Sequence, residues 1–317
     1  MEVGLILGEA SPLTWDRWRH VVALTERCGF HSLFRSDHYF NGQQKDAIDV
    51  YLSFVAAALE SRHIRFGPLV TPVTFREPVN VGRMAQQLDA LAHGRFILGL
   101  GVGWFEAEHR IYGIDYPPLK ERYERLDDAI DLMRVLWYDT SGQHDGPYYR
   151  LAGTDSRPHP PAGRPKILIG GRGPKRTLRA AARYADEWNA GGMPVEQYRA
   201  AIDALEGHCA DAGRDPAEIR RSMLLFTNAA PTARLRDIVS QRMVDMFAPG
   251  SGLTVEQLAA GGQGPHLFTG STAELVDVVG QLGELGLQEV VFEHFVTELD
   301  DVPEWLAQEV VPQLRSA

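Results

Sequence analysis

Eight short apolar segments alternate with helix-like segments along the whole chain, and this alternation limits the possible folds more than any other feature. The predicted strands cover residues 3–7, 31–34, 64–70, 96–100, 166–169, 187–190, 222–226 and 288–292. The predicted helices cover residues 14–27, 49–61, 78–92, 121–137, 174–184, 195–212, 272–285 and 302–314. A regular repeat of strand and helix without a linker predicts a parallel (β/α)8 barrel of the α/β class, with a doubly wound open sheet as the alternative. Because 317 residues lie in the usual range for such barrels, we expect one domain, residues 1–317.

Two connections are longer than the others. Residues 232–270 follow the predicted seventh strand and contain helix-like pieces and loops. Long connections in compact domains are often functional, so we expect an extended lid-like insertion here, acting as a mobile lid or as a dimer element. Residues 141–165 are rich in glycine and proline, which predicts a loop with at most a small hairpin.

The fourth predicted strand breaks into alternating glycines, Gly99, Gly101 and Gly103, at its carboxyl end. Glycines remove side chains there, so a flat ligand could lie close to the backbone. Trp104 follows directly and is either a wall for a planar ring system or a buried packing residue. The spacing differs from the dinucleotide fingerprint G-x-G-x-x-G, which also needs an acidic residue about 20 positions further on. A plain glycine-rich turn is the other interpretation.

The most specific local pattern lies at residues 169–177, where a strand ends in glycines and a helix follows. The glycines expose backbone N–H groups, and Pro174 is placed to open a helix whose positive dipole end faces the same point. The candidate phosphate ligands are Gly170, Gly171, Arg172, Gly173 and Thr177. No Walker motif is present, and the alternative is an ordinary strand-to-helix turn with a solvated basic face.

Polar and aromatic residues gather at the predicted carboxyl ends of the strands, where barrel enzymes carry their chemistry. They include Glu9, Asp37, His38, Thr71, Thr74, Trp188, Asn189, Thr227, Asn228, Glu293 and His294. His38 is the best candidate for proton transfer, because imidazole titrates near neutral pH and Asp37 is its neighbour. The alternative is a histidine that caps a helix or satisfies a polar group in the core.

Charge and cysteine content argue against several classes of function. The formal net charge of −10 disfavours binding to nucleic acid and to anionic membrane surfaces. The two cysteines are far apart, and no metal-binding spacing is present, so we expect neither a metal centre nor a disulfide framework. The chain begins without a basic leader and has no apolar run of about 18 residues. We therefore expect a cytoplasmic protein that acts on a small molecule.

Several motifs, in the same order, are similar to those of the luciferase-like monooxygenase superfamily, in particular its deazaflavin (coenzyme F420)-dependent oxidoreductase branch. They lie at residues 29–38, 71–78, 88–89, 94–95, 99–104, 112–113, 169–171 and 181–189. The resemblance covers almost the whole chain. A set of motifs in a shared order is far more specific than any one of them.

This resemblance implies a barrel that binds F420 or FMN at the strand ends, with the cofactor phosphate on the turn at residues 170–177. It also implies a non-prolyl cis peptide between Leu69 and Val70, in a bulge with Thr71 that would support the ring. His38 would lie near the reactive edge of the ring and assist hydride transfer. Asp37, Gly101 and Trp104 are counted with the expected cofactor contacts. A homodimer is expected on the same basis.

The expected activity is hydride transfer between F420 and a small, apolar organic substrate. An FMN-dependent monooxygenase that uses reduced flavin and oxygen is the main alternative, and a non-catalytic flavin-binding protein is the second. The sugar-phosphate dehydrogenases of the F420 branch have a tryptophan soon after the histidine and a glutamate after the glycine strand. This chain has Tyr39 and Phe40 after the histidine, and Trp104 near the glutamate position, so a phosphorylated substrate is not indicated.

Overall fold

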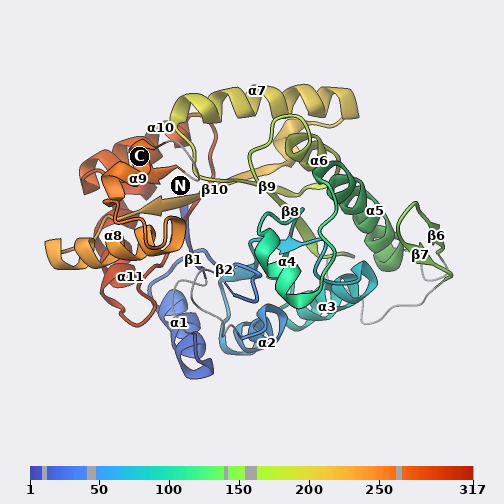
Figure 1. Cartoon of the computed structure of the whole chain (residues 1–317), viewed down its shortest axis with the longest axis horizontal. Helices are drawn as coiled ribbons and strands as arrows, with labels where there is room; N and C mark the ends of the chain where they lie inside the picture. Colours follow the sequence, from blue (N-terminus) through green and yellow to red (C-terminus); the bar gives the residue numbers. More distant parts are fainter. Residues whose placement is uncertain (9–12, 41–47, 139–141, 154–162, 262–265, 317) are drawn as a thin grey trace.

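The computed structural model describes residues 1–8, 13–40, 48–138, 142–153, 163–261 and 266–316, and its central feature is a barrel of parallel strands (Figure 1). The strands are β1 (Glu2–Leu7), β2 (Ser32–Arg35), β3 (Arg65–Pro68), β4 (Thr71–Pro72), β5 (Ile97–Gly101), β8 (Lys166–Gly170), β9 (Glu187–Ala190), β10 (Arg220–Thr227) and β12 (Glu289–Glu293). They are paired in the order β3-β2-β1-β12-β10-β9-β8-β5-β4, and β11 (Leu267–Phe268) is added beside β10.

Strands β3 and β4 share one position of the barrel and close it. β3 pairs with β2, whereas β4 pairs with β5. A bridge between Phe66 and Phe96 also joins β3 to the segment that precedes β5. The first strand, β1, lies between β2 and the last strand, β12. The predicted (β/α)8 barrel is therefore confirmed. The doubly wound alternative is wrong because it needs an open sheet, whereas the bridge between Phe66 and Phe96 joins the two ends of this one.

Helices surround the barrel, as Figure 1 shows. They are α1 (Trp15–Arg27), α2 (Val50–Glu60), α3 (Pro78–Leu91), α5 (Leu119–Tyr138), α6 (Thr177–Tyr184), α7 (Val195–Ala212), α10 (Thr272–Glu284), α11 (Asp301–Trp305) and α12 (Val311–Ser316). The Thr14 hydroxyl accepts a hydrogen bond from the Arg17 N–H, which confirms the predicted cap of α1. None of the helices in the described ranges combines the length and apolar character needed to cross a membrane.

Three helical segments differ from the prediction. Helix α6 begins at Thr177 and not at Pro174, because the Gly173 carbonyl accepts from the Leu178 N–H and residues 174–176 form a turn. The last predicted helix is interrupted by a π-helical turn, Leu306–Val310. A short helix, α4 (Glu106–Tyr112), was not predicted, although Gly113 ends it in the left-handed conformation, with φ of 67°.

The long connection after β10 contains two helices, α8 (Ala233–Phe247) and α9 (Val255–Ala260), before β11. Its residues 262–265 lie outside the described part of the chain. Its role as a lid or dimer element remains a prediction. The predicted small hairpin is present as β6 (His144–Asp145) and β7 (Arg150–Leu151), which pair antiparallel.

A plug of apolar side chains fills the inside of the barrel. It consists of Ile6, Phe34, Leu69, Ile97, Leu168 and Val291, which form one buried cluster. A second and larger core lies between the strands and the helices. The plug separates the amino-terminal ends of the strands from the carboxyl ends, so the two ends of the barrel can carry different polar groups.

The amino-terminal ends of the strands carry a charged cluster, here called the barrel-floor network. Its members are the first residues of five strands: Glu2, Arg65, Glu187, Arg220 and Glu289. Arg65 Nη2 lies 2.5 Å from Glu187 Oε2, and Arg65 Nη1 lies 3.1 Å from Glu289 Oε2. Arg220 Nη2 lies 3.1 Å from the same Glu289 oxygen. Both buried carboxylates therefore have guanidinium partners, as buried charges require.

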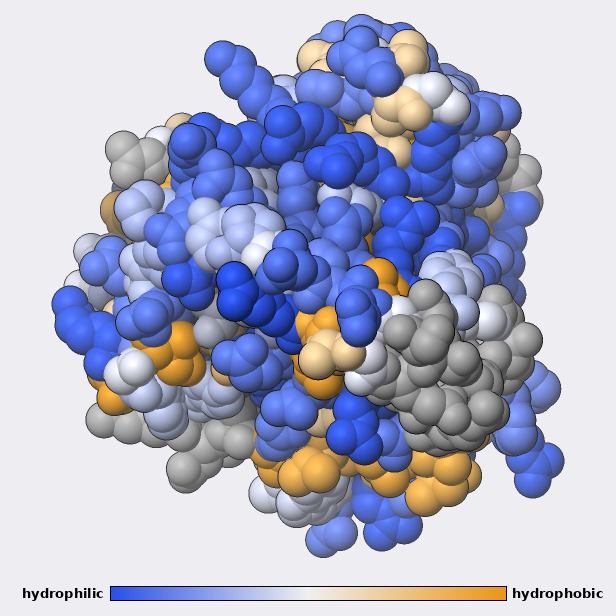
Figure 2. Space-filling view, turned by 90° about the vertical axis from the view of Figure 1, so that its right-hand side faces the viewer, coloured by the Kyte–Doolittle hydropathy of each residue, from blue (hydrophilic) through white to orange (hydrophobic). Residues whose placement is uncertain are grey.

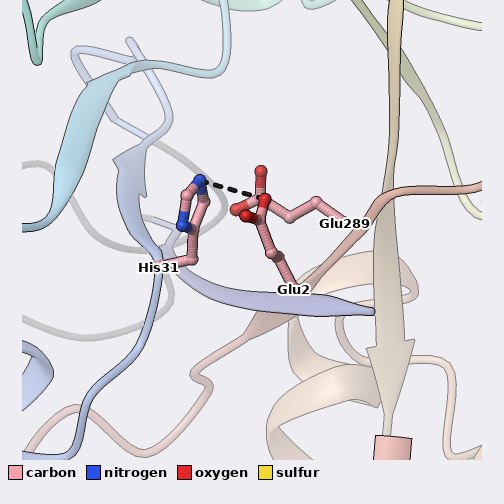
Figure 3. A group of neighbouring side chains, drawn as sticks. All are labelled: Glu2, His31 and Glu289. Carbon is pink, nitrogen blue, oxygen red and sulfur yellow. Dashed lines mark ion pairs between the residues drawn. The ribbon is translucent and has the colours of Figure 1, made fainter. Parts of the chain in front are cut away.

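His31 joins this network beside Glu2 and Glu289, and the three side chains are close enough to hold a metal ion (Figure 3). However, Arg65 Nη1 lies 3.3 Å from His31 Nε2, and a guanidinium can only donate, so Nε2 is an acceptor. Burial lowers the pKa of His31 to about 4; Glu2 opposes this effect, whereas Arg65 and Arg220 act in the same direction as burial. The 3.1 Å contact from Nε2 to Glu2 is therefore not an ion pair at neutral pH. We interpret this cluster as structural support, since the lone pairs that a cation needs already face two guanidinium groups.

We expect Arg65→Met to lower the free energy of unfolding by about 3–5 kcal/mol, because it leaves buried carboxylates with one guanidinium fewer. Urea unfolding followed by circular dichroism measures this change. The control is Arg150→Met, which breaks an ion pair with Asp145 whose side chains are both highly exposed. Equal losses in the two variants would contradict a supporting role for the network.

Candidate active site

The third strand of the barrel bends between β3 and β4, at a cis peptide bond between Leu69 and Val70. This confirms the position that the resemblance implied. The Val70 side chain projects over the ends of two neighbouring strands. A Cβ atom at Gly101 would lie 2.6 Å from Val70 Cγ2, and one at Gly170 would lie 2.7 Å from Val70 Cγ1. Both positions therefore require glycine to make room for the bulge, a reason that the sequence alone does not show.

His38 follows β2 at the carboxyl ends of the strands, which are here called the mouth of the barrel. Its ring is held by a residue that sequence reasoning missed. His38 Nδ1 lies 2.8 Å from Oε2 of Glu108, on helix α4. The other oxygen, Oε1, accepts hydrogen bonds from the backbone N–H groups of Tyr39 and Phe40. Glu108 is fully buried. The His38 Nε2 atom has no hydrogen bond to any residue in the described ranges, which leaves it available to a ligand.

Asp37 ties the segment that follows β2 to Thr71, directly after the bulge. Its Oδ2 accepts from the Thr71 hydroxyl at 2.8 Å and from Arg76 Nη1 at 2.5 Å, while Oδ1 accepts from Arg76 Nη2 at 3.1 Å. Tyr51 in turn donates to Thr71 at 3.0 Å, since the Thr71 proton is already used. Burial raises the pKa of Asp37, and the Arg76 guanidinium opposes this effect. The hydrogen bond between Asp37 and Thr71 thus fixes the segment that follows the bulge.

The predicted phosphate turn lies between β8 and α6. Gly171 has φ of 124°, and its N–H donates to the Asn189 carbonyl at 2.9 Å, so the expectation that this N–H is exposed to a phosphate is wrong. A Cβ atom at Gly173 would lie 2.8 Å from Oγ1 of the buried Thr177, so glycine at this position avoids a clash with the hydroxyl. Thr177 Oγ1 lies 2.6 Å from the hydroxyl of Tyr123 on α5, which the sequence did not indicate as part of the turn.

Positive charge lies beside these hydroxyls. The guanidinium of Arg176 lies 6.0 Å from the centre of the Tyr123 ring. Arg172 is exposed, and its Nη1 makes a long contact of 3.5 Å with the Gly192 carbonyl. The turn therefore combines glycines, two hydroxyl groups, a helix amino terminus and two basic side chains, which is a chemistry suited to an anion.

Aromatic rings line the mouth next to His38. Trp104 is 66% exposed, so the packing alternative for this residue is wrong. Its ring meets the His38 ring edge to face, with 5.7 Å between centroids, and stacks on Phe105 at 5.2 Å. Phe40 meets Phe105 edge to face at 5.7 Å. These rings give the histidine an apolar border.

Other candidates at the strand ends have structural partners. The Glu293 Oε1 atom accepts from the Gly8 N–H at 2.6 Å, and Asn189 Nδ2 donates to Ser222 at 2.9 Å. His294 is buried, and burial lowers its pKa to about 3, which keeps its ring neutral. Glu9 lies outside the described residues. Of the two histidines predicted at the strand ends, His38 is thus the one that is partly exposed, with an Nε2 atom that has no hydrogen bond to the described residues.

Known proteins with similar sequences include two bacterial enzymes. The phthiodiolone/phenolphthiodiolone dimycocerosates ketoreductase of Mycobacterium bovis is 32% identical over 212 residues, covering 63% of this chain and 53% of that protein. The F420-dependent glucose-6-phosphate dehydrogenase of Nocardia farcinica is 32% identical over 213 residues, covering 63% of this chain and 61% of that protein. The chain thus spans little more than half the length of these relatives.

Solved structures show the same fold at low sequence identity. The F420-dependent tetrahydromethanopterin reductase of Methanopyrus kandleri has a TM-score of 0.78 at 18% identity and covers 99% of both chains. An F420-dependent secondary alcohol dehydrogenase, bound to an F420-acetone adduct, has a TM-score of 0.79 at 19% identity and covers 99% of both chains. The long-chain alkane monooxygenase LadA has a TM-score of 0.81 at 16% identity, covering all of this chain and 91% of LadA.

The comparison with protein families agrees with this fold and with the motifs along the chain. Residues 3–237, about three quarters of the sequence, match the model of one family. The chain belongs to the luciferase-like monooxygenase family, and its relatives include F420-dependent oxidoreductases.

Proposed function

We propose that this protein transfers hydride between F420 and the carbonyl or alcohol carbon of a small organic substrate. The observation that carries the proposal is the pair formed by His38 and Glu108 at the barrel mouth. Interconversion of a ketone and an alcohol moves a proton as well as a hydride. An imidazole with one free nitrogen at the mouth can exchange that proton with a bound substrate.

The residues at the mouth fit a deazaflavin. Val70 forms a platform on the bulge, and Gly101 and Gly170 keep the neighbouring strand ends clear of side chains. The hydroxyls of Thr177 and Tyr123 lie together at a helix amino terminus, where a phosphate group binds well. Bound F420 would accept or supply the hydride, while the protein binds and orients the reactants.

Relatives support the same chemistry. One curated relative is named as F420-dependent, and another is named as a ketoreductase. The aromatic border of His38, made by Trp104, Phe105 and Phe40, suits an apolar substrate. These observations favour a ketone or secondary alcohol with apolar substituents.

We expect the cofactor-free protein to bind F420 more tightly than FMN in a fluorescence or absorbance titration. Gly170→Ala should weaken F420 binding by about tenfold, because the added Cβ would displace Val70. Gly191→Ala is the control, since a Cβ there meets open space. Tighter binding of FMN would instead favour an oxygen-consuming monooxygenase. Binding of neither would contradict the interpretation of the phosphate turn.

We expect His38→Ala to lower kcat by about 10²–10⁴-fold and to leave the Kd for F420 nearly unchanged, because the imidazole moves a proton and does not hold the cofactor. Steady-state kinetics and the same titration separate the two effects. His63→Ala, at a highly exposed histidine, is the control. Equal loss of turnover and affinity, or loss of neither, would count against this role. Binding of F420 without turnover in the unaltered protein would favour a non-catalytic binding protein.

We also propose that the chain forms a homodimer through helices α2 and α3. Helix α2 is apolar on all sides, although such helices are normally buried. Leu52 and Leu59 are 61% and 67% exposed on its outer face, and Val55 lies between them. Beside this ridge lies an apolar groove of about 460 Å³ between α2 and α3. Apolar surface gathers along the lower edge of Figure 2, on the side where α2 and α3 lie in Figure 1.

A ridge next to a groove on one face is complementary to itself, so a two-fold axis can place each ridge in the groove of the other copy. We therefore expect the unaltered protein to have the mass of a dimer in light scattering. The double variant Leu52→Lys with Leu59→Lys should shift it to the monomer, because buried lysines are costly at such an interface. Leu119→Lys, at an exposed leucine outside α2, α3 and residues 232–270, should have no effect. A monomeric unaltered protein, or an unchanged dimer in the double variant, would refute this interface.

A further inference from the structure

We propose that Glu108 is a positioning residue that fixes the tautomer of His38, so that Nε2 is the atom that exchanges the substrate proton. The inference rests on the proposed function for its chemical meaning, but its structural basis is independent of any cofactor. Glu108 belongs to α4, and the short helix brings its side chain to the turn that follows β2.

The hydrogen bonds of Glu108 determine which nitrogen of His38 carries the proton. Three donors converge on its two oxygens: the Nδ1–H of His38 and the backbone N–H groups of Tyr39 and Phe40. An ionised carboxylate accepts but cannot donate, so Nδ1 must be the donor. In the neutral ring the other nitrogen, Nε2, then carries a lone pair that faces away from Glu108.

Burial limits the access of water to the contact between His38 and Glu108. Glu108 is fully buried, and the His38 side chain is only 12% exposed. In the described part of the chain, the ion-pair partner of Glu108 is His38. When His38 takes a proton from the substrate, the positive charge therefore develops on a ring whose Nδ1 lies 2.8 Å from Glu108 Oε2.

His109, the neighbour of Glu108 on α4, differs from His38 in its hydrogen bonds. His109 Nδ1 lies 2.9 Å from the Phe105 carbonyl, and its Nε2 lies 2.7 Å from the Thr74 hydroxyl. Both nitrogens of His109 are used by the fold, so this ring anchors α4 to the segment after β4. His38 has one nitrogen used by the fold and one left for the reaction.

The proposed step can be written for an alcohol substrate. The O–H bond breaks and its proton moves to Nε2 of His38, while the C–H bond breaks and its electron pair leaves with the hydrogen as hydride. A bound deazaflavin would be the oxidant that receives this hydride, and the C–O bond of the substrate would become C=O. In the reverse direction the imidazolium returns the proton to the carbonyl oxygen. Glu108 keeps its charge throughout and acts only through His38.

The variant Glu108→Gln tests this role because it changes one acceptor into a donor. If the amide oxygen keeps the two backbone N–H groups, the amide NH₂ faces His38 Nδ1 and donates to it. We expect the neutral His38 ring to change from the Nδ1–H to the Nε2–H tautomer. Long-range ¹H–¹⁵N NMR of the cofactor-free protein reports this change directly.

Two controls accompany the measurement. His109 should keep its Nδ1–H tautomer in the variant, because the Phe105 carbonyl holds it. Glu106→Gln, at an exposed glutamate on the same helix, should leave both rings unchanged. With the loaded enzyme, we expect Glu108→Gln to lower kcat by about 10²-fold and to leave the Kd for F420 unchanged.

An Nε2–H tautomer of His38 in the unaltered protein would overturn the inference without any variant. An unchanged tautomer in Glu108→Gln, or an equal change in Glu106→Gln, would also overturn it. A tautomer that follows Glu108 in a protein that does not bind F420 would support the positioning role and refute the proposed function. Normal F420-dependent turnover with a tautomer independent of Glu108 would refute the positioning role alone.

Discussion

Closure of the barrel at its third strand is the constraint on which the rest of the structure depends. β3 pairs with β2 and β4 pairs with β5, and the bulge at Leu69 and Val70 lies between them. The bulge fits because Gly101 and Gly170, at the ends of the adjacent strands, have no side chains in the space that Val70 occupies. The same glycines leave the strand ends at the mouth free of side chains. The same two glycines therefore make room for Val70 and leave space for a flat ligand.

The two ends of the barrel treat polar groups in opposite ways. At the floor, Arg65 and Arg220 pair with the buried carboxylates of Glu187 and Glu289, and this end contributes stability. At the mouth, the described residues leave Nε2 of His38 without a partner. The apolar plug between the two ends keeps them apart. A charged network at the floor and a reactive group at the mouth can therefore coexist in one narrow barrel.

Helix α4 connects the fold to the proposed chemistry. It is only one or two turns long, yet it carries both Glu108, which holds His38, and His109, which anchors the helix through Thr74. Asp37, the sequence neighbour of His38, has a different task, because Arg76 and Thr71 occupy both of its oxygens. Proximity in sequence thus indicated the wrong carboxylate as the partner of the histidine.

Much of the fold could be read from the sequence by itself, because the underlying signals are local. Apolar periodicity located the eight strand positions, Thr14 marked the start of α1, and the glycines at residues 170–173 marked a strand-to-helix turn. The motifs also indicated the bulge at Leu69 and Val70 through the resemblance to a family. Only the tertiary structure identified Glu108 and Tyr123 at the site, since Glu108 lies 70 residues from His38 and Tyr123 lies 54 residues from Thr177. Contacts over such separations arise when the barrel closes, and no local periodicity encodes which side chains then meet.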